Sequence, residues 1–445
     1  MASNLLLGCA PGFNLRAVTA ENRTALTYRY EKWRALSSGV LETAGSTFLI
    51  LIAVRWFHAG AMAKAMVAGG SSVGLLLAPM VVAWVERRGL PTTRAAARLA
   101  IVGSATFVLM ALVPSLPVFV AGSILALACS SAMVPLLTQV YQENYPEARR
   151  GRLFSRTFMV RIAMAAAFAQ AGGWLLTANA NAHFLGLDFT GGIERFRWLL
   201  VGFAGAFVLA AFCLSRVPSR ALVAAGASTH PFRALRFVRE DRVFRTTLVA
   251  WMFLGLGNLM MVPLRVEYLA NSRYGVTLHG AALTAGAIAL LTSVLPNAAR
   301  FVLNPLWGWL FDRMNFFLLR ITLNVGFMLG ILSFFTSGSL TGMVVGALLY
   351  GMAVAGGDVA WSLWVTKFAP PERVADYMSV HTFFTGLRGV VAPVLAFQLA
   401  GVLSLAAIGW LSAGLILAGS LVLLPEVRLG RTARPGAAVV EEVAD

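Results

Sequence analysis

The sequence contains few charged residues and few cysteines. Charged residues occupy only 12% of the 445 positions, about half of the roughly 25% that is typical of soluble domains. The three cysteines, Cys9, Cys129 and Cys213, lie far apart and form no CxxC pair, so we expect neither disulfides nor a metal site. The sequence also contains no phosphate-binding loop and no nucleophile elbow. We therefore predict that the protein is not an enzyme and binds no cofactor.

Hydrophobic residues are abundant instead. They make up 58% of the chain, and the mean hydropathy is +0.76, as expected for an integral membrane protein. The formal net charge of +17 raises the alternative of nucleic-acid binding. However, the Lys and Arg residues fall in short loops between apolar runs, which is typical of loops beside a membrane surface. We predict no nucleic-acid partner.

The apolar residues form twelve runs, each near the ~20 residues that a helix needs to cross a bilayer. The first six lie at about 35–57, 62–85, 95–115, 117–140, 153–177 and 196–215. The second six lie at about 244–264, 279–310, 316–336, 340–365, 374–401 and 403–424. Because the runs are continuous rather than alternating, they predict helices and not the strands of a barrel.

The distribution of positive charge predicts the orientation of the chain. Most of the 36 Lys and Arg residues fall in segments that would share one side of the membrane, and the positive-inside rule makes that side cytoplasmic. We expect residues 14–34 to lie as a helix along the membrane interface. The expected segments are a cytoplasmic N-terminal segment 1–34, a first six-helix domain 35–215, a cytoplasmic linker 216–243, a second six-helix domain 244–424 and a cytoplasmic tail 425–445.

A short pattern recurs at about half the chain length. Residues 308–313 read Gly-Trp-Leu-Phe-Asp-Arg and end the eighth apolar run. A degenerate copy ends the second run, where Glu86 and Arg87 take the places of Asp312 and Arg313. The chain therefore reads as two related halves in parallel orientation.

The pattern Gly308-x-Leu310-x-Asp312-Arg313 resembles the signature between the second and third helices of major facilitator superfamily transporters, here in its second-half position. Together with the repeat and the twelve runs, the resemblance covers roughly Trp33 to Leu424. It implies an all-α membrane protein, with twelve transmembrane helices in two pseudo-symmetric six-helix bundles. The first copy departs from the signature, because Val82 stands where the family has Gly. The resemblance also implies a cytoplasmic latch, with candidates Glu86, Arg87, Gly308, Asp312 and Arg313.

Five charged residues fall inside the predicted spans, away from the span ends. Each would cost about 2.5–3.5 kcal/mol at the centre of a lipid-facing helix, so they must face protein or water. In the superfamily, the first two helices of each three-helix unit line a central cavity, and all five charges fall on helices of that kind. We therefore predict a polar central cavity. The charged residues are Glu42, Arg161, Arg300, Asp358 and Arg388.

Aromatic side chains accompany these charges. Tyr377, His381, Phe384 and Arg388 fall on one stripe of a helix, and Trp361 follows Asp358 by one turn. An aromatic stripe that ends in Arg is suited to an anionic, partly apolar solute.

An alternative gives these residues structural roles only. The aromatic side chains then pack between helices, Glu42 pairs with Arg161 and Asp358 pairs with Arg388. Under that alternative Arg300 has no acid, and the three Arg exceed the two acids by one charge.

Two features of proton-coupled superfamily members are missing. Residues 118–140 contain no Arg, and the Gly-Pro motif of the fifth helix is reduced to Ala171-Gly172-Gly173. Proton antiport therefore depends on Glu42 and Asp358 alone, whose desolvation would raise their affinity for a proton.

The prediction is a secondary active transporter that moves a small organic solute, preferably anionic or zwitterionic, by alternating access. One alternative is proton-coupled efflux of drugs or metabolites through Glu42 and Asp358. A second is a membrane sensor with a transporter fold that does not transport. The expected partners are a small-molecule substrate, the lipid bilayer and, under the first alternative, protons or another coupling ion. We expect a multi-pass monomer in the plasma membrane.

Overall fold

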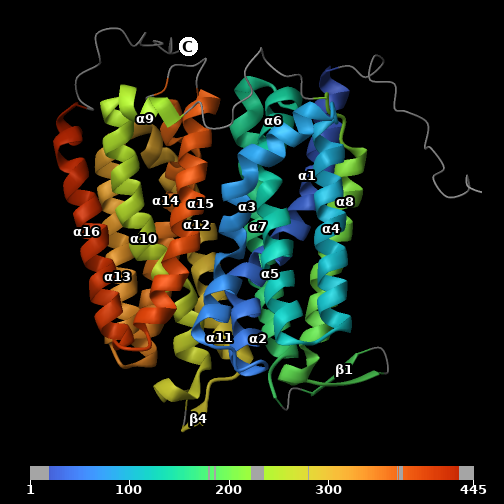
Figure 1. The fold of residues 1–445 in the computed structure, drawn as a ribbon, viewed down its shortest axis with the longest axis vertical. Coiled ribbons are helices and arrows are strands. Elements are labelled where there is room, and N and C mark those ends of the chain that lie inside the picture. The colour runs from blue at the N-terminus through green and yellow to red at the C-terminus, as the bar shows by residue number, and fades with distance from the viewer. Residues whose placement is uncertain are drawn as a thin grey trace, which may run out of the picture.

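The computed structural model describes residues 20–178, 181–184, 187–221, 235–278, 280–367, 369 and 374–429. Twelve helical segments in these ranges are long and apolar enough to cross a membrane. Figure 1 shows them standing side by side, with the short β-hairpins at one end. We call that end the hairpin side, and the opposite end, where α1 begins and α16 ends, the terminal side.

The first half of the chain contributes six of these segments. The first segment joins α1 (Ala20–Thr43), the π-helix η1 (Ala44–Phe48) and α2 (Leu49–Arg55). The others are α3 (Ala61–Arg87), α4 (Thr92–Leu112), α5 with α6 (Leu116–Ala132 and Val134–Asn144), α7 (Glu147–Leu175) and α8 (Phe196–Arg216). Strands β1 (Asn181–Phe184) and β2 (Leu187–Thr190) and the turn η2 (Ile193–Arg195) separate α7 from α8.

The second half begins with the short helix α9 (Arg236–Glu240). Its spans are α10 (Arg242–Ala270), α11–η5–α12 (Ala285–Ala289, Leu290–Val294 and Leu295–Arg313), α13 (Phe316–Thr336), α14 (Leu340–Leu363), α15 (Val374–Leu399) and α16 (Leu405–Leu429). The turn η4 (Ser272–Tyr274) and strands β3 (Thr277–Leu278) and β4 (Ala281–Ala282) follow α10, and the turn η6 (Trp364–Lys367) follows α14.

The helices form two six-helix bundles. In the first bundle α4 packs on α8, α3 on α5 and α1 on α7, and in the second α10 packs on α16 and α14 on both α12 and α13. The bundles meet along α3 and α15, and along α7 and the span α11–η5–α12. The sequence predicted this all-α architecture correctly.

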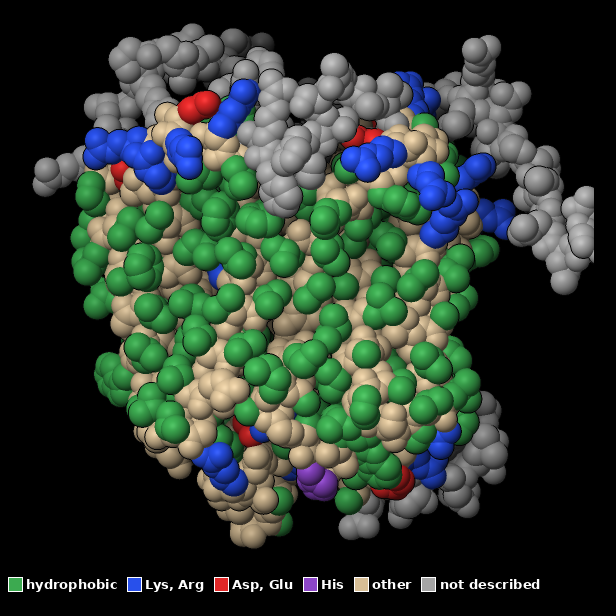
Figure 2. Space-filling model, viewed as in Figure 1, with side chains coloured by type: hydrophobic (Ala, Val, Ile, Leu, Met, Phe, Trp, Pro, Cys, Tyr) green, Lys and Arg blue, Asp and Glu red, His purple; other side chains and the backbone are tan. Residues whose placement is uncertain are grey.

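The outer surface explains why the chain needs a membrane. Figure 2 shows a wide band of hydrophobic side chains between a rim rich in Lys and Arg at the terminal side and a second rim at the hairpin side. Leu112 and Val208 are among the large apolar side chains left exposed on this surface. Such a band is stable against lipid but not against water.

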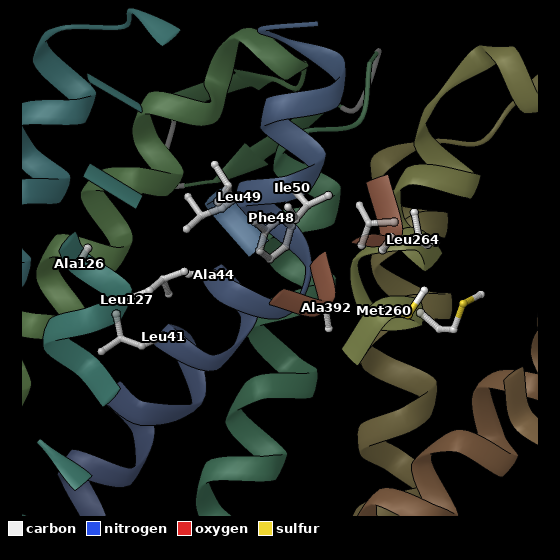
Figure 3. Close-up of a cluster of buried hydrophobic side chains, with 14 of the residues drawn as sticks. Leu41, Ala44, Phe48, Leu49, Ile50, Ala126, Leu127, Met260, Leu264 and Ala392 are labelled. Carbon is white, nitrogen blue, oxygen red and sulfur yellow. The ribbon is translucent and has the colours of Figure 1, made fainter. Parts of the chain in front are cut away.

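Two spans contain π-helical turns at the interface between the bundles. One is η1, which follows Glu42 by one residue, and the other is η5, which precedes Arg300. Thr47 and Thr292, one from each turn, lie 3.2 Å apart through their hydroxyl oxygens. Figure 3 shows Phe48 among buried apolar side chains, with Leu127 of α5 on one side and Leu264 of α10 on the other. Single π turns of this kind are common at functional sites.

The first span begins earlier than the sequence analysis predicted. Residues 20–34 form the start of α1 and do not lie along the interface as a separate helix. Glu31 is buried against α6, where its carboxylate accepts hydrogen bonds from Arg34 and from the Tyr141 hydroxyl. Because Glu31 and Arg34 pair with each other, both can lie inside the bundle. A search for continuous apolar runs leaves such charged residues out of the span. Residues 14–19 of the expected interfacial helix are outside the described ranges.

Candidate functional site

Four of the five charges predicted inside the spans form one connected group. Glu42 comes from α1, Arg161 from α7, Arg300 from α12 and Asp358 from α14. The Arg161 Nε donates to Glu42 Oε2 at 2.6 Å, and the Arg300 Nη1 donates to Glu42 Oε1 at 2.5 Å. The Arg300 Nε donates to Asp358 Oδ2 at 2.6 Å. We call these four residues the charge network. Within it, Arg300 of the second bundle connects to Glu42 of the first bundle.

The charge network is buried unequally. The side chains of Arg300, Glu42, Asp358 and Arg161 are 8%, 18%, 28% and 37% exposed. The Phe158 ring lies close to both guanidinium groups, with its centroid 5.4 Å from the guanidinium carbon of Arg161 and 5.1 Å from that of Arg300. Arg161 is therefore the member most open to a solute, and Phe158 offers an aromatic surface next to it.

The pairing differs from the one considered in the sequence analysis. Glu42 does pair with Arg161, but the partner of Asp358 is Arg300 and not Arg388. Arg300, expected to have no acid, is held by two acids and by the amide oxygen of Asn297 at 3.2 Å. The charge network thus contains two acids and two bases and has no surplus charge.

The other predicted site residues do not join the charge network. Tyr377 is buried at the terminal side, stacked on Phe237 and in contact with Asp241 through its hydroxyl at 3.3 Å. Phe384 is half-buried and packs edge-on against Phe383. These contacts lie within the second bundle.

His381, Arg388 and Trp361 also lie within the second bundle. The His381 ring lies 5.5 Å from that of Trp361 and is fully buried. The Arg388 Nη1 donates to the backbone oxygen of Trp251 at 2.7 Å. The predicted helical stripe is real, but most of it faces into its own bundle.

Sequence reasoning missed several buried charges. Arg320 and Arg265 lie at or beside the ends of predicted spans and were not among the five charges placed inside them, yet they are 3% and 7% exposed inside α13 and α10. Lys64, near the start of the second predicted span, donates from its Nζ to Glu267 Oε1 at 2.6 Å, and this ion pair joins α3 to α10. Glu267 carried a signal that could have been used, because it is an acid in a stretch that is apolar apart from Arg265. The basic residues gave no such signal, because a Lys or Arg near the end of a span is expected to face the membrane surface.

The latch candidates lie at two helix ends on the terminal side. Glu86 and Arg87 end α3, while Gly308, Asp312 and Arg313 lie in the last turns of α12. The guanidinium of Arg313 lies 4.4 Å from the centroid of the Trp309 ring. The Asp312 side chain is outside what the structure describes, and the latch remains a prediction.

Several polar contacts join described residues of the two bundles at mid-span or toward the hairpin side. Besides the Lys64–Glu267 pair, the Arg55 guanidinium donates to the backbone oxygens of Ala270 at 3.2 Å and Leu283 at 2.6 Å. The Gly286 N–H donates to the Thr177 hydroxyl at 3.0 Å.

Glycines bring the backbones close in the same region. A Cβ added at Gly386 of α15 would lie 2.6 Å from the backbone nitrogen of Leu76 in α3, closer than packing allows. Small residues at such contacts are typical of helices that pack tightly in a membrane.

Comparison with known proteins gives matches in structure only. No family model matches the sequence, and no curated protein matches it. The nucleoside transporter NupG is similar, with a TM-score of 0.66 and 11% identity, over 93% of this chain and 100% of that one. A D-xylose-proton symporter has a TM-score of 0.60 and 14% sequence identity, over 93% of this chain and 99% of that one. The human organic anion transporter MFSD10 has a TM-score of 0.61 and 15% sequence identity, over 91% of this chain and 99% of that one.

These solved structures are membrane transporters and not enzymes. The chain has the fold of major facilitator superfamily transporters, as the resemblance at residues 308–313 predicted. At these identities the likeness is one of fold, so substrate and coupling must be argued from the residues of this chain.

Proposed function

We propose that the protein is a secondary transporter that moves a small organic solute by alternating access. The observation that carries this proposal is the position of Arg300, which donates to Glu42 of the first bundle and to Asp358 of its own. The Arg300–Glu42 ion pair crosses the interface between the bundles at mid-span. Any solute that binds these charges therefore changes a contact that fixes the relative position of the bundles. A solute that competes for these groups would change the contacts on which bundle movement depends.

The contacts between the bundles support a conformation that is closed on the hairpin side. Arg55, Lys64 and Thr177 all join the bundles there. We propose that both chain termini are cytoplasmic, because the terminal side carries the richer rim of Lys and Arg (Figure 2). The conformation would then be open toward the cytoplasm, and the protein would be a multi-pass monomer of the plasma membrane.

The chemistry of the charge network favours a zwitterionic or anionic solute. With two acids and two bases, the charge network offers a partner to each pole of a zwitterion without leaving a protein charge unpaired. A carboxylate would reach Arg161 first, since that side chain is the most exposed of the four. An apolar or aromatic part of the solute would then pack on Phe158, which already lies over both guanidinium groups.

A two-stage experiment tests this proposal. A thermal-shift screen of the purified protein identifies solutes that bind the folded state and so raise its stability. Counterflow in proteoliposomes then compares matched zwitterionic, anionic, neutral and cationic compounds. We expect transport of a zwitterion or anion that falls at least about tenfold in Arg161→Gln, the effect of losing one charged hydrogen bond. Arg149→Gln, an exposed arginine on the same helix, is the matched control.

Two outcomes would count against the proposal. Transport of cations alone, unchanged by Arg161→Gln, would contradict the substrate class. Ligands that bind but never exchange across the liposome membrane would instead favour the sensor alternative.

Proton coupling is a second candidate, and the contacts of Asp358 favour it. Asp358 accepts one hydrogen bond from Arg300 and is more exposed than Glu42, which is held by two guanidinium groups. Protonation of Asp358 would release Arg300 from one acid while Glu42 still holds it. Transport should then respond to a pH gradient, and Asp358→Asn combined with Glu42→Gln should remove that response. Wild-type transport that ignores the gradient would eliminate this candidate.

A further inference from the structure

A second group of buried polar side chains lies inside the second bundle, apart from the charge network. It consists of Arg320 from α13, His381 and Arg388 from α15, Trp251 from α10, and Trp364, the first residue of η6 after α14. All five are between 0% and 6% exposed. We call this group the cationic cluster.

The cluster is arranged around the Trp251 indole. The guanidinium carbons of Arg320 and Arg388 lie 4.2 Å and 5.7 Å from the centroid of this ring. The His381 ring lies 5.3 Å from it and 5.2 Å from the Trp364 ring. Two guanidinium groups therefore share one indole, and a histidine lies beside them.

Many hydrogen-bond donors in this cluster have no acceptor. They include the Nε and Nη1 of Arg320, the Nε of Arg388 and the indole nitrogens of Trp251 and Trp364. Neither ring nitrogen of His381 has a partner. Across the described ranges, no acid forms an ion pair with Arg320 or Arg388. A buried charge without a partner is strongly unfavourable, and what this cluster lacks is negative charge.

Stacking on Trp251 does not remove the deficit. A ring face attracts the flat face of a guanidinium, whereas the unsatisfied N–H groups point outward in the guanidinium plane. Two like charges on one indole also repel each other. An acceptor that binds in the plane of the N–H groups would satisfy the donors and separate the charges.

The backbone of α10 leaves room for the Arg388 side chain at Gly255. Gly255 lies one turn after Trp251, and a Cβ added there would collide with the Nε and Cδ of Arg388. An alanine at this position would displace the guanidinium from the cluster. The glycine thus allows Arg388 to lie against the helix backbone.

We propose that the cationic cluster binds a small anion inside the second bundle, either a carboxylate or an inorganic anion. The anion accepts from Arg320, Arg388 and the neighbouring indole N–H groups. This site is separate from the charge network, although α14, which carries Asp358, leads directly into η6, which begins with Trp364. Its occupancy does not depend on whether the protein transports.

A binding experiment on the purified full-length protein tests this proposal without any transport assay. The protein is kept in detergent in a zwitterionic buffer without added salt, and its thermal midpoint is measured while chloride, phosphate, acetate or benzoate is added. We expect at least one probe to raise the midpoint to a plateau. Chloride or phosphate would identify an inorganic anion, and acetate or benzoate a carboxylate.

Three substitutions make the test specific. Arg320→Gln and Arg388→Gln should weaken the apparent Kd for that probe by about tenfold or more, because each removes a charged hydrogen bond. Gly255→Ala should weaken it through the displaced guanidinium. Arg265→Gln should leave the response intact, since Arg265 is an equally buried guanidinium that lies elsewhere, 3.8 Å from the Tyr350 ring.

A second measurement does not depend on variants that fold. Crystals of the wild-type protein grown in bromide should show an anomalous peak between Arg320 and Arg388 if the cluster accepts halide, and a carboxylate that binds should displace it. A midpoint that no probe raises to a plateau, together with no bromide peak, would overturn the proposal. So would a plateau that is identical in Arg320→Gln and Arg388→Gln.

Discussion

Each bundle buries arginine side chains outside the charge network, but among the described residues only the first bundle supplies an acid to neutralise them. In the first, Arg34 donates to both oxygens of Glu31 at 2.7 Å and 2.8 Å and to the Tyr141 hydroxyl at 2.8 Å. In the second, Arg320 and Arg388 share an indole and have donors without acceptors. Burial is similar in both places. The balance of donors and acceptors is what separates a self-contained structural pair from a site that lacks a ligand.

The charge network adds a third case. Its donors and acceptors are balanced, as around Arg34, but they come from two bundles. Glu31 and Arg34 lie one turn apart on one helix, so no bundle movement can separate them. Glu42 and Arg300 lie on different bundles, so a relative movement must stretch or exchange their contact.

The largest effect is expected from breaking the charge network at Arg300. Arg300→Gln leaves Asp358 without its partner and Glu42 with only Arg161. Losing one member of a buried ion pair costs about 3 kcal/mol or more, and coupling between the bundles is lost as well. We expect transport to fall to background and the free energy of unfolding to drop. Arg94→Gln, an exposed arginine on α4, should leave both unchanged, and wild-type transport by Arg300→Gln would refute the assigned role.

The comparison between the two arginine clusters predicts a difference in stability. Glu31→Gln leaves Arg34 buried without its acid and should lower the free energy of unfolding by about 3 kcal/mol. Arg388→Gln removes a charge that has no acid, so in anion-free buffer the loss should stay below about 1 kcal/mol or become a gain. Denaturant unfolding of the purified variants measures both values. Equal losses would mean that Arg388 is neutralised in the protein itself.

The smallest effect is expected at the predicted latch. Asp312 lies in the last turn of α12, on the terminal side, away from the charge network at mid-span. Asp312→Asn should slow transport severalfold while substrate affinity stays within about twofold, because a contact remote from the site changes cycling more than binding. Equilibrium binding and transport rates, measured on the same preparation, separate the two. A tenfold loss of affinity at an unchanged rate would show that Asp312 belongs to the binding site.

The sequence predicted the fold because apolar runs of bilayer length leave few alternatives. The charges at Glu42, Arg161, Arg300 and Asp358 were recognisable for the same reason, since a charge within a span must face protein or water. Their pairing was not recognisable. Arg300 lies 58 positions from Asp358 and 258 from Glu42, and only the packing of the two bundles brings both acids to one guanidinium.

Arg320 shows a different limit of sequence reasoning. It is the fifth residue of α13, and a basic residue so close to the end of a span is expected to reach the membrane surface rather than the bundle interior. Its burial depends on the indole of Trp251, which a helix far away in the sequence contributes. Long side chains near span ends can reach either water or the bundle interior, and hydropathy does not distinguish the two.

Spin-label distances on the two sides of the membrane test alternating access most directly. One pair replaces Arg88 and Glu240 on the terminal side, and the other replaces Glu194 and Thr277 on the hairpin side, with Cys9, Cys129 and Cys213 changed to Ala. All four label positions are exposed, and each pair has one position in the first half of the chain and one in the second. Glu267→Gln weakens the Lys64–Glu267 pair that closes the hairpin side, and Glu21→Gln serves as an exposed control.

The account predicts that Glu267→Gln lengthens the hairpin-side distance and shortens the terminal-side distance together, as expected when two bundles rock about a central site. Glu21→Gln should leave both distributions as in the wild type. If the hairpin-side distance lengthens while the terminal-side distance also lengthens or stays fixed, the bundles do not alternate about the charge network, and the central claim is wrong.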